Sequence, residues 1–211
     1  MTDRGETRTA PGANAPASCW SCRGPAGDGA FCATCGAVQP PRPLDHFARL
    51  GLARGFTLDP AELDRRYFAL QRDLHPDRFA RHSARERQIS QSQAVALNEA
   101  YETLKTPLRR AEYLLRLAEQ PVDRESTLRD PELLAEQMER REALAEAATL
   151  PALEACVGGA AADAAALESD ITAAFARGDL ALARRATLRL RYLLRLLDEA
   201  RARRERIAPA A

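Results

Sequence analysis

Leu74-His75-Pro76-Asp77-Arg78-Phe79 is the stretch that decides how this chain folds. Pro76 ends the helix before it, because proline has no N–H to donate and disfavours helical geometry at the preceding residue. That helix has apolar residues at helical spacing, namely Leu63, Tyr67, Leu70 and Leu74. A second helix of opposite direction follows. We therefore expect His75-Pro76-Asp77 at the exposed tip of a helical hairpin, where a stiff and polar group is suited to contact another molecule.

Capping signals indicate where the two hairpin helices begin. Asp59 can cap the first helix, with Pro60 at its first position and Glu62 reaching back to the cap. Ser83-Ala84-Arg85-Glu86 is a capping box that opens the second helix, which should run to about Lys105. The stripe that this helix should bury consists of Gln93, Leu97, Ala100 and Leu104. The two helices are therefore predicted to pack antiparallel and to hold the tip between them.

The composition favours helix almost throughout. Ala, Leu, Arg and Glu dominate the 211 residues, 45% of which are hydrophobic, so the chain can bury a real core. Two shorter helices are expected at 44–50, with Leu44, Phe47 and Leu50 on one face, and at 108–119. The sequence therefore predicts an all-α fold, with one helical domain at residues 44–119.

Bulk charge and hydropathy exclude some partners. The net charge is +1, which does not imply a polyanion, and we expect no nucleic-acid partner. No apolar run looks long enough to span a bilayer and no secretory signal is evident, so we expect no membrane partner. The bacterial cytoplasm is the predicted location, with the mitochondrial matrix as the alternative.

Four cysteines near the start form two C-x-x-C pairs. Cys19 and Cys22 are separated from Cys32 and Cys35 by nine residues, and four thiolates suffice for a closed tetrahedral zinc site. We predict a structural zinc ion there; a redox dithiol pair and a labile cluster site are the alternatives. The predicted module occupies residues 19–43 with its Pro-rich linker, after a disordered tail at 1–18. The fifth cysteine, Cys156, is expected to be a small buried apolar residue.

The last third of the chain predicts an antiparallel three-helix bundle at residues 131–207, after a linker at 120–130. Asp130 caps its first helix, and Leu150-Pro151 separates the first from the second. Gly158-Gly159 should bend or interrupt the second helix, and Gly178-Asp179 should end it. The core stripe expected in the last helix is Ala186, Leu190, Leu193, Leu197 and Ala200.

The first bundle helix has two apolar stripes. Leu133 and Leu144 can face the bundle, while Leu134 and Met138 face outward among acidic residues. An exposed apolar pair with a charged rim is suited to binding a partner. The alternative is that Leu134 and Met138 are themselves core residues.

Residues 44–119 resemble a J domain, the module that recruits DnaK-class ATPases, on the strength of His75-Pro76-Asp77 in its helical frame. The resemblance implies that this tripeptide docks on the ATPase and promotes ATP hydrolysis. Basic residues around it would steer the encounter, namely Arg65, Arg66, Arg72 and Arg78. One departure is that Phe68-Ala69 stands where many J domains carry a basic pair, which indicates a dedicated rather than a general ATPase.

The run 136–142 and the cysteine module resemble the HscB family, the J-type co-chaperones of iron–sulfur cluster assembly, in the form that carries an N-terminal four-cysteine extension. The resemblance implies an adaptor that presents an IscU-like scaffold protein to an HscA-like ATPase and is not itself an enzyme. By position, scaffold binding falls on Leu134, Met138, Glu139, Glu142, Glu146 and Tyr192. Ala135 makes that apolar patch smaller. Weak self-association is a further expected interaction.

Three other functions fit parts of the sequence. The chain could be a J-type co-chaperone for an unrelated client. ATPase stimulation that increases when an IscU-like scaffold is added would indicate the iron–sulfur co-chaperone, and stimulation without such an increase would indicate another client. A metalloenzyme that uses His46, His75 or His82 lacks the closely spaced ligand pairs of such sites. A nucleic-acid-binding zinc ribbon lacks basic and aromatic residues around the cysteines.

Overall fold

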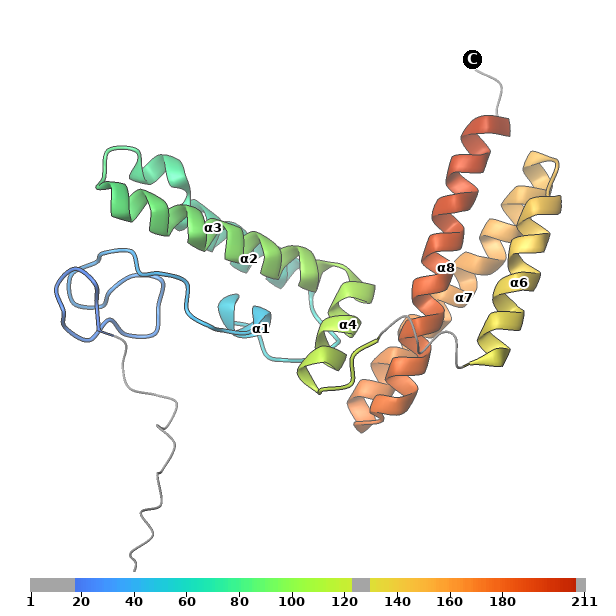
Figure 1. Ribbon diagram of the computed structural model, residues 1–211, viewed down its shortest axis with the longest axis horizontal. Coiled ribbons are helices and arrows are strands. Elements are labelled where there is room, and N and C mark those ends of the chain that lie inside the picture. Colours follow the sequence, from blue (N-terminus) through green and yellow to red (C-terminus); the bar gives the residue numbers. More distant parts are fainter. Residues whose placement is uncertain (1–17, 123–129, 208–211) are drawn as a thin grey trace, which may run out of the picture. The chain divides into compact units, whose positions relative to one another are not determined.

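The computed structural model describes residues 18–122 and 130–207, which fall into two compact units (Figure 1). The first unit comprises residues 18–44 and 68–98, and the second comprises 45–67 with the described part of 99–211. The predicted tail up to residue 17 and most of the predicted linker lie outside the described residues. Within those residues the fold is all-α, as predicted: there is no β-strand, only two isolated bridges, Ser18 with Pro25 and Phe31 with Val38.

The predicted hairpin is present. Helix α2 spans Pro60–Leu74, a 3-10 turn η1 spans Pro76–Phe79, and helix α3 spans Ala84–Lys105 (Figure 1). The capping box forms as expected, with Ser83 N donating to Glu86 Oε2 at 3.0 Å and Glu86 N donating to Ser83 Oγ at 3.3 Å. We call residues 75–79 the tip loop.

Within the first unit, the tip loop stands beside the cysteine module, which we define as residues 18–43. Leu74 and Phe79 are buried on either side of the exposed tripeptide, so both ends of the tip loop are anchored in apolar surroundings. The N-terminal part of α3 carries Ile89, Ser90 and Gln93 on its buried face. The apolar cluster inside the module is small and consists of Cys19, Ala26 and Cys32, with Ala37 packed against it.

The second unit begins with α1, His46–Arg49, and continues through the other ends of α2 and α3 to α4, Pro107–Leu117. Tyr67 stacks on Tyr101 with ring centroids 4.0 Å apart, and the Tyr101 hydroxyl donates to Asp64 at 2.8 Å. These contacts join α2 to α3 as antiparallel neighbours. Phe47 and Leu50 are buried as expected, whereas Leu44 is exposed, because the helix starts only after it.

The bundle in the second unit consists of α6 (Pro131–Glu146), α7 (Leu150–Arg177) and α8 (Leu180–Ile207), side by side in Figure 1. All five residues of the predicted α8 stripe are buried. Asp130 Oδ1 accepts from Leu133 N at 3.0 Å and so caps α6, while Gly178 takes the left-handed conformation that ends α7, with φ 71°. The all-α class and the three-helix bundle are confirmed.

Three local predictions are wrong. Helix α7 is not interrupted at Gly158-Gly159: it continues from Leu150 to Arg177, and neither glycine is packed against another part of the chain. Glu62 does not cap α2; it is held by Arg65 and Arg66 instead. Cys156 is half-exposed, with its Sγ 3.8 Å from the Ala143 carbonyl oxygen, rather than buried.

The expectation that no run could span a bilayer is also too strict. Among the described residues, α7 is long and apolar enough to cross a membrane by length and composition alone. The helix is rich in alanine and packs along α8, and its buried residues include Leu153, Ile171 and Ala174. A core helix of a bundle passes the same test, so length and composition do not separate the two cases.

Candidate functional site

The tip loop presents its tripeptide in a fixed geometry. His75 caps the η1 turn, and its Nδ1 accepts from Asp77 N at 3.3 Å, while Pro76 occupies the first position of the turn. Phe79 closes the turn from the buried side. The Asp77 side chain is 90% exposed and that of His75 is 50% exposed. The loop therefore offers a carboxylate and an imidazole to solvent from a backbone that is held in place.

The unpaired carbonyl group at the end of α2 accepts a hydrogen bond from a side chain of α3. Leu74 is the last residue of α2, so its carbonyl has no partner within the helix. Ser90 on α3 supplies that partner, with Oγ donating to Leu74 O at 2.7 Å in a fully buried position. Because a lost buried hydrogen bond leaves an unsatisfied polar group, this contact ties the start of the tip loop firmly to α3.

The arginines predicted to surround the loop differ in how they are paired. Arg65 and Arg66 both bind Glu62 on their own helix, Arg66 at 2.7 Å. Arg78 lies 4.0 Å from Asp73. Arg72 is exposed, and within the described residues it makes no ion pair. The basic charge that remains available near the tip is thus carried mainly by Arg72 and, more weakly, by Arg78.

Phe68 is exposed on α2, at 56% of its surface, one turn before Arg72. At this position, where many J domains carry a basic residue, the helix that leads to the tip loop therefore has an exposed aromatic ring. Large exposed apolar side chains of this kind favour a contact site when they adjoin other recognition groups. Val95 on α3 is also exposed.

The four cysteines of the module converge. Their four Sγ atoms all lie within 4.8 Å of one another, with Cys19 and Cys35 3.7 Å apart and Cys22 and Cys32 3.9 Å apart. A tetrahedral site with Zn–S bonds of about 2.3 Å has sulfur–sulfur edges of about 3.8 Å. The donor set therefore fits a zinc ion that would be held by all four cysteines, with no position left for water or substrate.

Neighbouring N–H groups favour the thiolate form of the two buried cysteines, Cys19 and Cys32, whereas the pKa of Cys22 is raised to about 11, because the backbone N–H of Gly24 is outweighed by burial and by contacts with the other three thiols. Ser21 N and Gln39 Nε2 each donate to Cys19 Sγ at 3.3 Å, and Thr34 N donates to Cys32 Sγ at 3.4 Å. Burial alone would raise the pKa of Cys19, but the backbone N–H groups of Cys22 and Ser21 outweigh it and lower that pKa to about 6. The pKa of Cys32 is lowered chiefly by the backbone N–H of Cys35.

Glycines and their neighbours shape the two turns that carry the cysteines. Gly36, after the second pair, has φ 73°, as its place in a tight turn predicts. After the first pair, Arg23 has a positive φ of 61°. The first turn thus takes an unusual conformation at a residue with a side chain.

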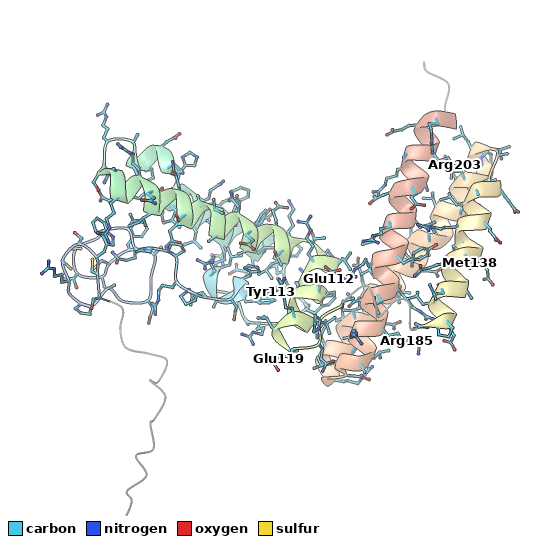
Figure 2. The ribbon with its side chains drawn as sticks, in the orientation of Figure 1. Glu112, Tyr113, Glu119, Met138, Arg185 and Arg203 are labelled. Atoms are coloured by element: carbon cyan, nitrogen blue, oxygen red, sulfur yellow. The ribbon has the colours of Figure 1, made fainter. Side chains whose placement is uncertain are left out.

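Helix α6 carries the second predicted site. Leu133 and Leu144 are buried in the bundle, whereas Leu134 is half-buried and Met138 is 65% exposed (Figure 2). We call the outward set the outer face of α6, which consists of Leu134, Met138, Glu139, Glu142 and Glu146. The two apolar stripes are therefore separated as predicted, and the alternative in which Met138 is a core residue is excluded.

Tyr192 does not belong to the outer face of α6. It is 8% exposed, and its hydroxyl donates to the Gln137 carbonyl oxygen at 2.7 Å. Burial raises the pKa of this hydroxyl, so it stays protonated and remains a donor. The structure places Tyr192 beneath α6, where it fixes the helix against α8 and leaves little ring surface for a partner.

Sequence reasoning missed the contacts that join the cysteine module to α3. Gln39 and Gln93 are both 6% exposed, and Gln93 Nε2 donates to Gln39 O at 2.8 Å. The only signal was the place of a glutamine in the predicted buried stripe of α3. A buried amide needs partners, but the sequence did not show which residues would supply them.

Known proteins resemble the chain over most of its length. The family described as the HSCB C-terminal oligomerisation domain matches residues 129–201. The iron–sulfur cluster co-chaperone protein HscB of Mus musculus is 34% identical over 192 residues, which cover 88% of this chain and 82% of the mouse protein. A co-chaperone protein HscB homologue of Aeromonas salmonicida is 47% identical over 104 residues, 49% of this chain and 60% of that protein.

The fold is shared as well. The crystal structure of human co-chaperone protein HscB superimposes with a TM-score of 0.85 at 33% identity, and covers 89% of this chain and 98% of the human one. Because the relatives include mammalian and bacterial proteins, they do not decide between the cytoplasm and the mitochondrial matrix for this chain.

Proposed function

This chain belongs to the HscB family of iron–sulfur cluster co-chaperones, and from that premise we propose a division of labour between its two ends. The tip loop binds a DnaK-class ATPase of the HscA type and stimulates ATP hydrolysis. The outer face of α6 binds an IscU-like scaffold protein. The chain thereby brings a scaffold with its nascent cluster to the ATPase, which promotes cluster transfer, and performs no catalysis of its own.

The observation that carries this proposal is the geometry of the tip loop. An exposed carboxylate, Asp77, stands on a backbone that His75, Ser90 and Phe79 hold in one conformation. A carboxylate presented in this way can pair with an arginine of a partner in a charge-assisted hydrogen bond. Little side-chain or loop entropy is lost on binding, because the loop is already ordered. Arg65, Arg66, Arg72 and Arg78 would add electrostatic steering, to which Arg72 contributes most because it is unpaired.

The proposed scaffold site is a patch of modest size. Met138 supplies a flexible apolar side chain, and the surrounding glutamates suit a partner with basic residues. Leu134 adds part of its surface, and Ala135 adds little. We assign Tyr192 an indirect part here, as the residue that holds α6 in place.

We further propose that the cysteine module holds one structural zinc ion. Two of the sulfur–sulfur distances, 3.7 and 3.9 Å, match the edge of a tetrahedral site, and a closed set of four thiolates leaves no place for chemistry on a substrate. Elemental analysis of the purified chain should give one zinc per chain. The content should fall with Cys22→Ser and stay unchanged in Cys156→Ser and in a variant that lacks all three histidines.

A steady-state ATPase assay tests the adaptor function. An HscA-like ATPase is measured alone, with this chain, with an IscU-like scaffold, and with both together. We expect stimulation by the chain and a greater than additive effect with the scaffold. Stimulation without any scaffold effect would leave a J-type co-chaperone for another client, and no stimulation at all would overturn the proposal.

A further inference from the structure

The cysteine module is docked on α3 through a buried amide. Gln93 Nε2 donates to the Gln39 main-chain oxygen at 2.8 Å, and neither side chain has appreciable contact with solvent. Gln39 belongs to the module and Gln93 to the buried face of α3. A hydrogen bond in such a position fixes the two segments against each other, because breaking it leaves a buried polar group without a partner.

The same glutamine reaches the metal site. The Gln39 side chain donates through Nε2 to Cys19 Sγ at 3.3 Å and to Ala37 O at 2.7 Å. Outer-shell donors of this kind orient a metal-bound thiolate and are oriented by it in return. A metal ion held by Cys19 would therefore fix the position of Gln39, and with it the acceptor that Gln93 uses.

The next link leads to the tip loop. Ser90 lies one helical turn before Gln93 on α3, and its hydroxyl donates to Leu74 O at 2.7 Å. Leu74 directly precedes His75. From Cys19 through Gln39, Gln93 and Ser90 to Leu74, every contact is buried or nearly so, and one rigid turn of helix joins the two halves.

A second set of contacts runs parallel to this one at the surface. The Arg85 guanidinium lies over the Trp20 ring, 4.6 Å from its centroid, and Trp20 Nε1 donates to Val38 O at 2.6 Å. Between the module and the hairpin tip lies a cavity of about 370 Å³. Its walls include Phe31 and Val38 on the module and Arg78, Phe79 and Glu86 on the hairpin tip. The module thus forms one side of the space behind the tip loop.

Building on the function proposed above, we propose that the metal-bound cysteine module is the brace of the tip loop, with Gln39 and Gln93 as its positioning residues. The metal orders the module, the module fixes α3, and α3 holds the carbonyl that starts the loop. Loss of the metal therefore loosens the loop that engages the ATPase, while the outer face of α6 still binds its scaffold.

Two measurements on the full-length chain test the brace. The first is amide hydrogen exchange of the η1 turn, where Arg78 N donates to His75 O at 3.0 Å and Ala80 N donates to Asp77 O at 3.2 Å. Exchange at these amides should become about tenfold faster after zinc is removed by chelation, and about fivefold faster in Gln93→Ala. The second is ATPase stimulation, for which the concentration of chain at half-maximal effect should rise by about fivefold in Gln93→Ala.

Matched variants separate bracing from general damage. Gln91→Ala changes an exposed glutamine on the same helix and should behave as the unmodified chain. Arg85→Ala removes the contact of an exposed side chain with Trp20, leaves the buried residues unchanged, and should shift both readouts about twofold. Binding of the IscU-like scaffold should be equal in all of these proteins, with and without zinc.

The brace is overturned if exchange in the η1 turn is the same with and without zinc and in Gln93→Ala. In that case the brace would be wrong even if the unmodified chain stimulated the ATPase fully, so the proposed function could still hold. Conversely, a chain that does not stimulate the ATPase at all but shows zinc-dependent exchange would overturn the proposed function and leave the brace intact.

Discussion

The tip loop and the outer face of α6, the two proposed binding sites, differ in how they are built. The tip loop is small and stiff, with Asp77 projecting from a turn that buried contacts hold at both ends. The outer face of α6 is an ordinary exposed helix surface, on which Met138 is the main apolar group among glutamates. A stiff site depends on the geometry of single atoms, whereas a helix face depends on area and charge, so we expect all-or-none effects at the first and graded effects at the second.

The two regions also differ in the buried core on which they are packed. Under α6 lies a three-helix core in which Leu133, Leu190 and Leu193 are almost completely buried. Behind the tip loop lie a short helical hairpin and a small module with hardly any apolar core. Below about 40 residues a domain usually needs metal or disulfides for stability. We therefore expect the tip loop to depend on polar contacts and on the proposed metal ion, and the outer face of α6 to depend on hydrophobic packing of the bundle.

The largest expected effect is at the tip. Asp77→Asn keeps the size and the turn of the loop but removes the charge, so ATPase stimulation should fall to background, while scaffold binding measured by calorimetry stays unchanged. Asp73→Asn, a carboxylate change close by that leaves the tripeptide intact, is the control and should keep most of the stimulation. Full stimulation by a folded Asp77→Asn chain would show that the tip does not work through a single carboxylate.

The reverse pattern is expected on α6. Leu134→Ala together with Met138→Ala should weaken scaffold binding by about tenfold or more, since exposed apolar anchors dominate such contacts, and should leave scaffold-free ATPase stimulation untouched. Each single change should give a part of the loss. The control is Ala135→Ser, a small change between the two positions. If the double variant bound the scaffold normally, the client site would have to lie elsewhere on the bundle.

Helix ends and buried stripes could be predicted from the sequence because they are set by local chemistry. The capping box at Ser83 and Glu86, the stop at Pro76 and the end of α3 at Lys105 all depend on residues within one turn. The four cysteines were predicted as a set because their spacing alone brings them together. The His75-Pro76-Asp77 tip followed from the same local rules.

Contacts between distant segments could not be predicted in this way. A pair of glycines inside a helix costs about 2 kcal/mol relative to alanine, which suggested a break at Gly158, but packing of α7 along α8 outweighs that cost. Whether Tyr192 is buried or exposed depends on how α8 is rotated in the bundle, which the local sequence does not specify. The bond from Gln93 to Gln39 joins positions 54 residues apart, and nothing in either local sequence specifies it.

A smaller effect is expected from the exposed ring on α2. Phe68→Arg restores a basic residue one turn before Arg72, so the chain should stimulate a general DnaK about two- to fivefold better and the HscA-like ATPase correspondingly less well. Val95→Arg adds the same charge to an exposed position on α3 and is the matched control. Equal changes in both variants would mean that net charge, and not the position of Phe68, decides the choice of ATPase.

The smallest expected effect is a pH-dependent change in stability at the helix cap beside the tip loop. The Ser83 hydroxyl, the Ser83 N–H and His82 together lower the pKa of Glu86 from its ordinary value of 4.5. Because the folded pKa is the lower one, the charged cap contributes stability above pH 4.5 that is lost as the pH falls through the folded pKa. Glu86→Ala should therefore destabilise the chain by about 1 kcal/mol at pH 7 and by less at pH 3.

The cap of α7 provides the comparison, because it has no titrating group. Thr149 Oγ1 accepts from Ala152 N at 3.4 Å, so Thr149→Ala should cost about 1 kcal/mol at both pH values. Urea unfolding of both variants at pH 7 and pH 3, followed by circular dichroism, measures the difference. A cost of Glu86→Ala that did not shrink at pH 3 would contradict a charged cap beside the tip loop, and would indicate that Glu86 stabilises α3 by packing alone.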